Sequence, residues 1–291
     1  MNFLAIVFVL ARVGASVVYH HQIPFRIDAN QQLFVDALST EGQPISVKLH
    51  LMHLSTGARG STSRGFWLPR MDQAGRFLFT DESDRFLRTD EYGIGIGHLS
   101  SLLTQYQSAT IIKRTADRGY LYMNATRDVF VNSCVNGTII TAEAAAQESP
   151  SIFGTFFHAR IYSSTFRVKI CDARRRTVLI TPPAVYDFVD SQIRAQGCYN
   201  RGSDDREFVY CSNSSEFRSH LPDIHFQFVG SGTLVITAHD YLVHSATAGT
   251  WYLKLVRGET TVQQYSVNPL ELAFTNLRIS HNRIEICESV Y

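Results

Sequence analysis

The stretch Leu221-Pro222-Asp223-Ile224-His225-Phe226-Gln227-Phe228, followed by Asp240-Tyr241-Leu242-Val243, decides the fold of this chain. Ile224 to Phe228 and Thr233 to Thr237 are rich in β-branched and aromatic residues, and the Gly230 to Gly232 cluster separates them. This pattern predicts a pair of strands joined by a turn.

The rest of the chain is also predominantly β. Ile45 to Met52 alternates apolar and polar residues with the period of a half-buried strand. Further β-rich runs lie at Val129 to Val131, Thr138 to Thr141, Phe166 to Ile170, Trp251 to Val256 and Asn282 to Ile286. The sequence therefore predicts a mostly β protein.

Helical patterns are few. The longest runs from Pro182 to Gln196, with Thr181 as its expected cap and Gly197 after its end. Its apolar residues at helical spacing, which should share one buried face, are Val185, Val189 and Ile193. Shorter helices are expected at Leu99 to Tyr106 and Ala142 to Gln147.

The first fifteen residues have the pattern of a signal peptide. Phe3 to Ala11 is an apolar run too short to span a bilayer, and Val13-Gly14-Ala15 offers small residues for cleavage after Ala15. The alternative is a buried first strand. Because no later run is long and apolar enough to span a membrane, we expect a secreted protein without an anchor.

Glycosylation sequons and cysteines agree with secretion. The sequons lie at Asn124, Asn136 and Asn213. The chain has five cysteines, which in an oxidising compartment suggests two disulfides. Cys198 and Cys211, close in sequence, are the first expected pair. The pairing of Cys134, Cys171 and Cys287 stays open, with Cys171–Cys287 as the preferred second pair.

Charge and motifs argue against several other functions. The net charge of +1 gives no reason to expect nucleic acid as a partner. The eleven histidines show no zinc-enzyme spacing, although His220, His225, His239 and His244 bracket the strand pair, so we expect neither metal nor cofactor. No Gly-x-Ser-x-Gly elbow is present, and Cys134 is expected to be a structural or unpaired thiol rather than a nucleophile.

Several fragments, in order along the chain, resemble the pepsin-like aspartic proteases. Leu33-Phe34-Val35-Asp36, Gly42-Gln43-Pro44 and Gly65-Phe66-Trp67-Leu68-Pro69 are similar to segments around the first active-site loop. In the second half the similar segments are Thr177 to Tyr186, the stretch from Leu221, and Asn282 to Ile286. Between them, Gly93 to Gly97 is similar to a glycine-rich segment of the same family. The resemblance implies a mostly β, two-lobed acid-protease fold.

The departures from that family concern its catalytic residues. Each family loop carries an Asp-Thr-Gly or Asp-Ser-Gly, and the two aspartates share one proton. The first aspartate position falls on His53, or on Ser55 after a shift of two. The second falls on Ala173, or on Asp172 after one insertion. A His–Asp pair could exchange a proton but could not reproduce the shared proton of two carboxylates.

The first lobe is also expected to be shorter than in the family. Arg70 to Tyr92 shows little β alternation and leaves no room for the full hairpin, or flap, that closes over the substrate. The implied lobes are residues 16–148 and 149–291, with the seam near Gln147 to Pro150. The shortened N-terminal lobe favours an open cleft.

Three functional hypotheses follow. The leading one is a secreted, catalytically inactive homologue that binds a peptide or protein in the cleft between the lobes. The second is an active aspartic-type endopeptidase with a displaced dyad. The third is an unrelated secreted β-sandwich that binds carbohydrate, which would be favoured if the two loops lay far apart. The ligand and the oligomeric state stay open.

Overall fold

A computed structural model describes most of the second half of the chain and parts of the first half. The described residues are 21–28, 33–38, 44–51, 68–71, 77–80, 95–98, 106–115, 117–143, 157–162, 164–170, 177–203, 206–211, 217–228, 231–245, 250–259, 265–280 and 283–291. The predicted signal peptide, residues 1–15, and the predicted seam near Gln147 to Pro150 lie outside these ranges.

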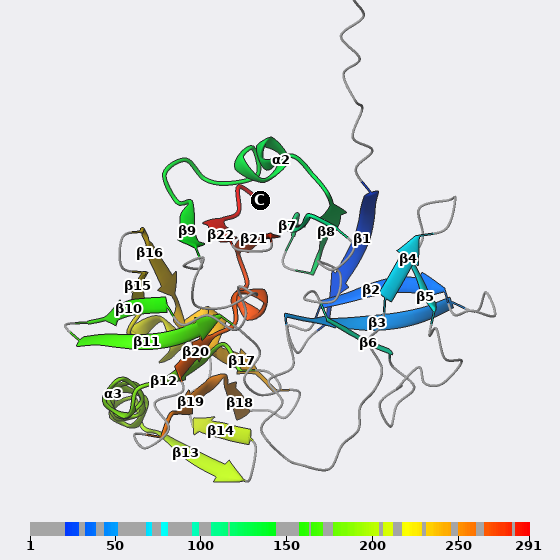
Figure 1. Cartoon of the computed structure of the whole chain (residues 1–291). Helices are drawn as coiled ribbons and strands as arrows, with labels where there is room; N and C mark the ends of the chain where they lie inside the picture. Colours follow the sequence, from blue (N-terminus) through cyan, green and yellow to red (C-terminus); the bar gives the residue numbers. More distant parts are fainter. Residues whose placement is uncertain are drawn as a thin grey trace, which may run out of the picture.

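The first half of the chain contributes most of an eleven-stranded sheet (Figure 1). Its main path is β4-β5-β2-β1-β8-β7-β21-β22-β9, and β3 pairs with β2 and with β6 beside this path. The strands are β1 (His21–Ile27), β2 (Leu33–Leu38), β3 (Pro44–His50), β4 (Leu68–Met71), β5 (Phe77–Thr80), β6 (Gly95–His98), β7 (Ser108–Lys113), β8 (Arg118–Met123), β9 (Ile140–Glu143), β21 (Thr275–Ser280) and β22 (Arg283–Glu288).

The last hairpin of the chain, β21–β22, lies inside this first sheet. β21 pairs antiparallel with β7, and β22 pairs antiparallel with β9. The C-terminus accordingly lies beside α2 (Arg127–Val131), where the Val290 amide donates to the Ser133 carbonyl at 3.1 Å (Figure 1). The sheet is therefore built from both ends of the sequence.

The second half forms a seven-stranded and a four-stranded sheet. The first has the order β16-β15-β10-β11-β20-β12-β19, and the second has the order β13-β14-β18-β17. Their strands are β10 (Phe157–Ile161), β11 (Ser164–Ile170), β12 (Leu179–Thr181), β13 (Cys198–Ser203), β14 (Arg206–Cys211), β15 (Ile224–Phe228), β16 (Thr233–Ile236), β17 (Leu242–His244), β18 (Thr250–Leu253), β19 (Leu255–Arg257) and β20 (Tyr265–Val267). The mostly β class is thus confirmed.

The stretch from Leu221 forms the predicted strand pair. β15 and β16 pair antiparallel with Ile224 opposite Ile236. Apolar side chains of β15 are buried while its polar ones are exposed, which is the expected period of two. Tyr241, at the end of α4 (Ala238–Tyr241), donates its hydroxyl to the Pro222 carbonyl at 2.9 Å, so the two parts of the stretch touch.

The long predicted helix is α3 (Pro183–Ala195). Val185, Val189 and Ile193 are buried as their spacing predicted, and Gly197 follows the helix with φ of 73°. The expected cap is wrong. Pro182 occupies the N-cap position, and the buried Thr181 hydroxyl instead donates to the Pro182 carbonyl at 3.4 Å.

In the first half, one predicted strand lies in a helix and the start of a predicted helix lies in a strand. The β-rich run Val129 to Val131 belongs to the helix α2, whose Phe130 is buried beneath it. Ala142, expected to start a helix, lies in β9 and is buried. Pairing with β22 overrides the helix propensity of Ala142. Of the helix predicted at Leu99 to Tyr106, only Tyr106 is described, and it lies outside any element.

Trp251 to Val256 does not form one strand. β18 ends at Leu253 and β19 begins at Leu255, and the two strands belong to different sheets. Lys254 between them is buried, and its amide donates to the Tyr241 carbonyl at 2.7 Å. A buried polar residue therefore marks the change of sheet.

The segment Arg70 to Tyr92 contains more β structure than its sequence suggested. β4 and β5 pair antiparallel with Leu68 opposite Thr80, and β5 also pairs in parallel with β2. The expectation of little β structure there is therefore wrong for Phe77–Thr80.

One hydrophobic core connects the sheets. A continuous cluster of buried residues extends from Ile23 in β1 to Ile286 in β22, and it includes the side chains of α3. The largest fully buried side chains include Tyr241, Phe130 and Phe226. Within the described part of the chain, no helix has the length and apolar content required to span a membrane.

Candidate functional site

Each of the two loops singled out by sequence follows a strand that has a parallel neighbour. β3, which leads toward His53, pairs in parallel with β6, and Val47 lies opposite Gly95. β11, which leads toward Asp172, pairs in parallel with β20, and Val168 lies opposite Tyr265. Each loop therefore follows a strand that is held by a parallel neighbour. Loops held by a rigid scaffold are common places for function.

The return from the second loop is also described. β12 pairs antiparallel with β20, so β20 lies between β11 and β12. β11 and β12 are therefore antiparallel to each other without being neighbours in the sheet. Ile170 and Val178 on either side of the connection between these strands are both fully buried, which fixes the ends of the loop in the core.

The four candidate active-site positions, His53, Ser55, Asp172 and Ala173, lie outside the described residues. Leu51, the last described residue before the first loop, is fully buried. The scaffold on each side of the loops is thus established, and the roles of the four residues stay predictions.

A group of buried charges lies where the chain passes from the second half back to the first sheet. The crossing segment is η3 (Pro269–Glu271) and the residues after it. Lys254 Nζ donates to the Glu271 carbonyl at 2.9 Å and lies 3.0 Å from Glu271 Oε2. Lys113, from β7, donates its Nζ to the carbonyls of Leu270 and Leu272. Two lysines that are far apart in the sequence therefore hold one short segment.

Asp240 completes this group. Its Oδ1 accepts from the Ala273 amide at 2.8 Å, and its Oδ2 accepts from the Thr237 amide at 2.9 Å as a capping box of α4. Burial, reinforced by the charge of Lys254, lowers the pKa of Lys113 to about 8, while Asp240 and Glu271 oppose the shift. The group fixes the crossing, and neither lysine is placed on an open surface.

A polar hollow of about 640 Å³ opens beside the ends of β7, β21 and β22 in the first sheet. It is lined by Gln107, Ser108, Asn124, Ala125, Thr126, Arg278, Ser280 and Arg283. Asn124 has φ of 55°, and its Oδ1 accepts from the Gln107 amide at 2.7 Å. This hollow brings together a predicted glycosylation position and two arginines.

The charge of Arg278 in this hollow is balanced by the buried carboxylate of Glu285. Glu285, fully buried, accepts from Arg278 Nη1 at 3.0 Å and from Arg127 Nε at 2.6 Å. Arg283 pairs with Glu143. Because the described residues of the lining include no carboxylate, imidazole or thiol, they offer polar contacts rather than acid–base chemistry.

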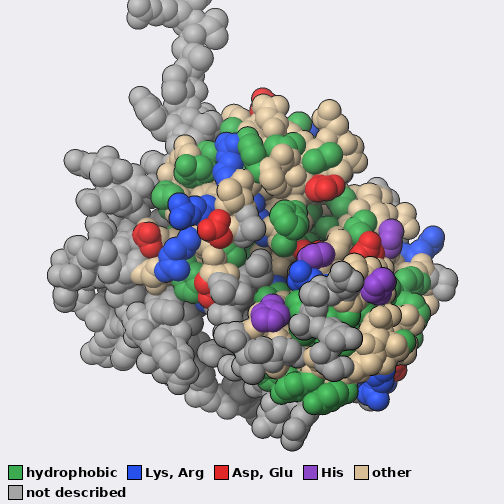
Figure 2. Space-filling model, turned by 180° about the vertical axis from the view of Figure 1, so that it is seen from behind, with side chains coloured by type: hydrophobic (Ala, Val, Ile, Leu, Met, Phe, Trp, Pro, Cys, Tyr) green, Lys and Arg blue, Asp and Glu red, His purple; other side chains and the backbone are tan. Residues whose placement is uncertain are grey.

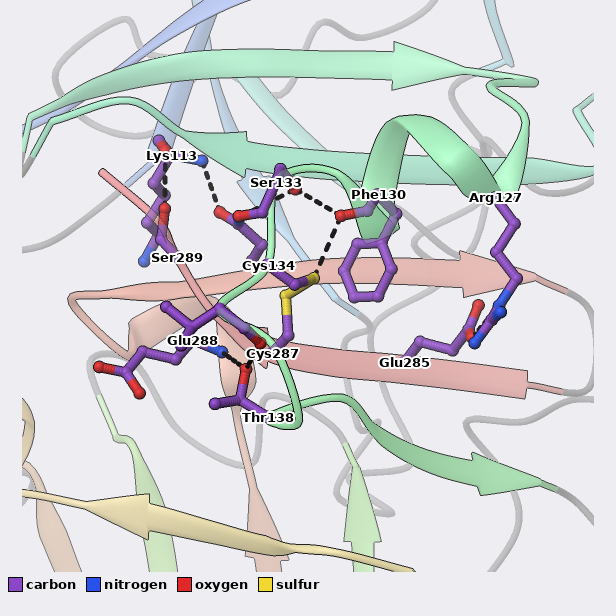
Figure 3. The surroundings of a disulfide bond; sticks show 12 residues. Lys113, Arg127, Phe130, Ser133, Cys134, Thr138, Glu285, Cys287, Glu288 and Ser289 are labelled. Atoms are coloured by element: carbon purple, nitrogen blue, oxygen red, sulfur yellow. Dashed lines mark hydrogen bonds and ion pairs between the residues drawn. A yellow bond between two sulfur atoms is a disulfide. The ribbon is translucent and has the colours of Figure 1, made fainter.

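Two disulfides are present. Cys198 is bonded to Cys211 across β13 and β14, which is the pair expected from sequence. The preferred second pair, Cys171 with Cys287, is wrong, because Cys287 is bonded to Cys134. Figure 3 shows this bond beneath α2, with Phe130 beside it and the Ser133 hydroxyl donating to the Phe130 carbonyl at 2.7 Å. Cys134 is therefore part of a disulfide, which is one of the two alternatives expected from the sequence.

The second described sequon, Asn136, lies beside this disulfide. Asn136 is exposed, and the Thr138 hydroxyl donates to the Val135 carbonyl at 2.7 Å while it accepts from the Glu288 amide. Asn213 lies outside the described residues. Glycosylation at all three positions stays a prediction.

The histidines that bracket the strand pair are all exposed. His220, His225, His239 and His244 come from η2 (Phe217–His220), β15, α4 and β17, respectively. Figure 2 shows histidine side chains spread over one face of the molecule rather than gathered at one point. In the described ranges, no three metal-binding side chains come together.

No protein-family model and no curated protein matches this chain.

The buried charged group was not apparent from the sequence. Lys113 ends a strand whose residues are all buried, and Lys254 interrupts an apolar run. The pattern of each segment indicates a buried strand and gives no sign of a charged cluster. The usable signal was a lysine inside an apolar run, because a fully buried lysine is rare without a partner.

Proposed function

We propose that this chain is a secreted, catalytically inactive homologue of the pepsin-like aspartic proteases that binds a peptide or protein between its two halves. One observation carries the proposal. The strand before each candidate loop has a parallel partner from later in the chain: β3 pairs with β6, and β11 pairs with β20.

Parallel pairing recurs in the same way in both halves. The first half contains the parallel pairs β2–β5 and β3–β6, and the second contains β11–β20 and β12–β19. Most other described pairs are antiparallel hairpins or meanders, so a chance repeat of this feature at both loops is improbable. The repeat supports a fold with two related lobes.

The placement of the family-like fragments supports the same proposal. The glycine-rich segment that resembles the family contributes β6, the parallel partner of the strand after Gly42-Gln43-Pro44. The stretch from Leu221 contributes β15, in the same sheet as β11 and β12. These two fragments thus pair within the half of the chain in which they lie, whereas Asn282 to Ile286 contributes β22, which pairs with β9 in the first sheet.

Inactivity follows from the residues of the two loops. Aspartic proteases activate water with two carboxylates that share one proton, because two like charges at close range cannot both ionise. The first loop offers His53 or Ser55 instead of an aspartate, and the second offers at most Asp172. A cleft without that pair keeps the shape for an extended peptide but lacks its acid and base.

The experiment compares binding with cleavage. The purified mature protein is incubated with a fluorescent pool of extended random-sequence peptides and with a denatured protein, from acid to neutral pH. We expect peptide retention without any new cleavage product. Turnover that a transition-state-mimicking peptide inhibitor blocks would overturn the inactive assignment, and absence of peptide binding at every pH would overturn the binding assignment.

Matched variants separate the two readings of the second loop. Asp172→Asn removes the one candidate carboxylate with almost no change of shape, and Arg175→Gln is a control for charge in the same loop. If the protein is inactive, both variants bind peptides as the parent does. A loss of turnover confined to Asp172→Asn would instead establish the displaced dyad.

A further inference from the structure

The seven-stranded sheet has one buried and one exposed face. In β10, β11, β15 and β16, which lie side by side in Figure 1, apolar residues alternate with polar ones. The buried side chains of these strands include Ala159, Ile161, Val168, Ile170, Ile224, Phe226, Phe228, Leu234 and Ile236. The other face, called the outer face below, carries the exposed side chains.

The outer face is basic. Arg160 and Arg167 are exposed, Lys169 is half-buried, and His225 is exposed. The four strands contain no aspartate or glutamate. The nearest described acid along the chain is Asp223, just before β15. This face is therefore far more positive than a net charge of +1 for the whole chain would suggest.

The register places polar groups in a row across all four strands. Arg160 lies opposite Thr165 of β11 on one side and opposite Gln227 of β15 on the other, and Gln227 lies opposite Thr233 of β16. Neighbouring strands are about 4.8 Å apart, so this row is roughly 14 Å long. Arg167 is a diagonal neighbour of Arg160, at about 7–8 Å between backbones.

The cations retain donors for a ligand. Arg160 makes no ion pair with any residue that the structure describes. Arg167 and Lys169 do have partners within the chain. A guanidinium has five N–H donors and an ammonium has three, so an internal partner does not exhaust them.

We infer that the outer face is a docking surface for a sulfated polysaccharide. Arginine binds planar groups of anionic oxygens through paired hydrogen bonds, which suits sulfate. The hydroxyl and amide groups of Thr165, Gln227 and Thr233 lie in the same row as Arg160 and suit sugar hydroxyls. This inference does not depend on the proposed cleft.

Two other polyanions fit the face less well. Binding to a bilayer surface depends on exposed apolar side chains that insert into it. Among the described outward-facing side chains of these four strands, Val235 is the exposed apolar one, so little apolar area is offered. Single-stranded nucleic acid needs aromatic side chains on which its bases stack. The strands' aromatic residues Phe157, Phe226 and Phe228 are buried, and Phe166 packs against the core.

The test compares two triple variants with the same change of net charge. The first removes the outer-face cations with Arg160→Gln, Arg167→Gln and Lys169→Gln. The control removes three exposed cations elsewhere with Arg118→Gln, Arg194→Gln and Arg257→Gln. Circular dichroism and the melting temperature establish that both variants are folded before binding is measured.

Binding is measured on immobilised heparin-type polysaccharide over a range of salt concentrations. We expect the parent and the control to bind alike and the outer-face variant to bind at least about tenfold more weakly. The magnitude of the slope of log affinity against log salt should fall by about 2–3. Each contact with an anionic group releases counterions on binding, and the variant lacks three such contacts. If the triple variant does not fold, Arg160→Gln alone should still lower the slope by about 1.

The opposite results overturn the inference. An equal loss in the control would show that only net charge matters, and equal binding of a desulfated polysaccharide would exclude sulfate recognition. Tighter binding to phosphatidylserine vesicles or to single-stranded DNA than to the polysaccharide would assign the face to another partner. Failure of the parent to bind the polysaccharide at low salt would remove the proposed ligand altogether.

Discussion

Lys254 and Glu271 form an ion pair in the interior, with Nζ 3.0 Å from Oε2 and only 2% of the lysine side chain exposed. Lys254 separates β18 from β19, and Glu271 ends η3, the segment that returns the chain to the first sheet. The pair therefore connects the point where the chain changes sheets with the point where it crosses between the two halves.

Removal of one partner of this pair should be strongly destabilising. Lys254→Met leaves the Glu271 carboxylate without its cation, and we expect a loss of about 3–5 kcal/mol in the free energy of unfolding. Urea denaturation followed by fluorescence measures this loss. The double variant Lys254→Met/Glu271→Leu should recover a large part of it, because no unpaired charge stays buried; equal stability of the single and double variants would contradict this account.

Lys113 should make the stability rise with pH in the alkaline range. Burial lowers the pKa of Lys113 to about 8 from an ordinary 10.5, so the unfolded chain binds more protons than the folded one between these values. The free energy of unfolding should therefore increase by about 2 kcal/mol from pH 8 to about pH 9.5. Above that range burial of Tyr241, which raises its pKa, acts in the opposite direction.

The measurement for Lys113 is urea denaturation at several pH values. Lys113→Met should lose the rise between pH 8 and about pH 9.5, whatever its absolute stability. Lys48→Met, at a half-buried lysine of β3, is the control and should keep the rise. A rise of the same size in Lys113→Met would assign it to another group.

Peptide mapping without reduction should find Cys134 joined to Cys287 and Cys198 joined to Cys211. Of the five cysteines this leaves Cys171, so titration of the denatured, unreduced protein should find one thiol per chain. Each bridge should contribute about 2–4 kcal/mol to the free energy of unfolding. A peptide that joins Cys171 to Cys287 would contradict the second bridge.

Gly119 has no space for a side chain. A Cβ at this position would overlap with the Ile112 carbonyl oxygen and with the ring of Phe25 on β1. Gly119→Ala should therefore reduce the free energy of unfolding by about 1–3 kcal/mol, as overpacking does elsewhere. Thermal unfolding measures the effect. Gly232→Ala, which approaches only the Ile140 side chain at 3.1 Å, is the control and should cost less.

Some strands beside the candidate loops could be predicted from the sequence because they depend on local order, whereas the candidate residues themselves lie outside the described part of the chain. The resemblance named both loops, and the glycine-rich Gly93 to Gly97 was placed in the first half, where β6 indeed lies. The pairing of β6 with β3, and of β20 with β11, could not be predicted. Parallel pairing joins segments far apart in sequence, and no local pattern records which strands will meet.

The sequence by itself determined the β15–β16 pair, the buried face of α3 and the Cys198–Cys211 bridge, because each depends on residues close together in the chain. Only the tertiary structure decided that β21 and β22 join the first sheet and that Cys134, 153 residues before Cys287, is its partner. It also divided Trp251 to Val256 between two sheets at the buried Lys254. These features arise from contacts between distant segments, whose burial and pairing outweigh the local propensities of the residues involved.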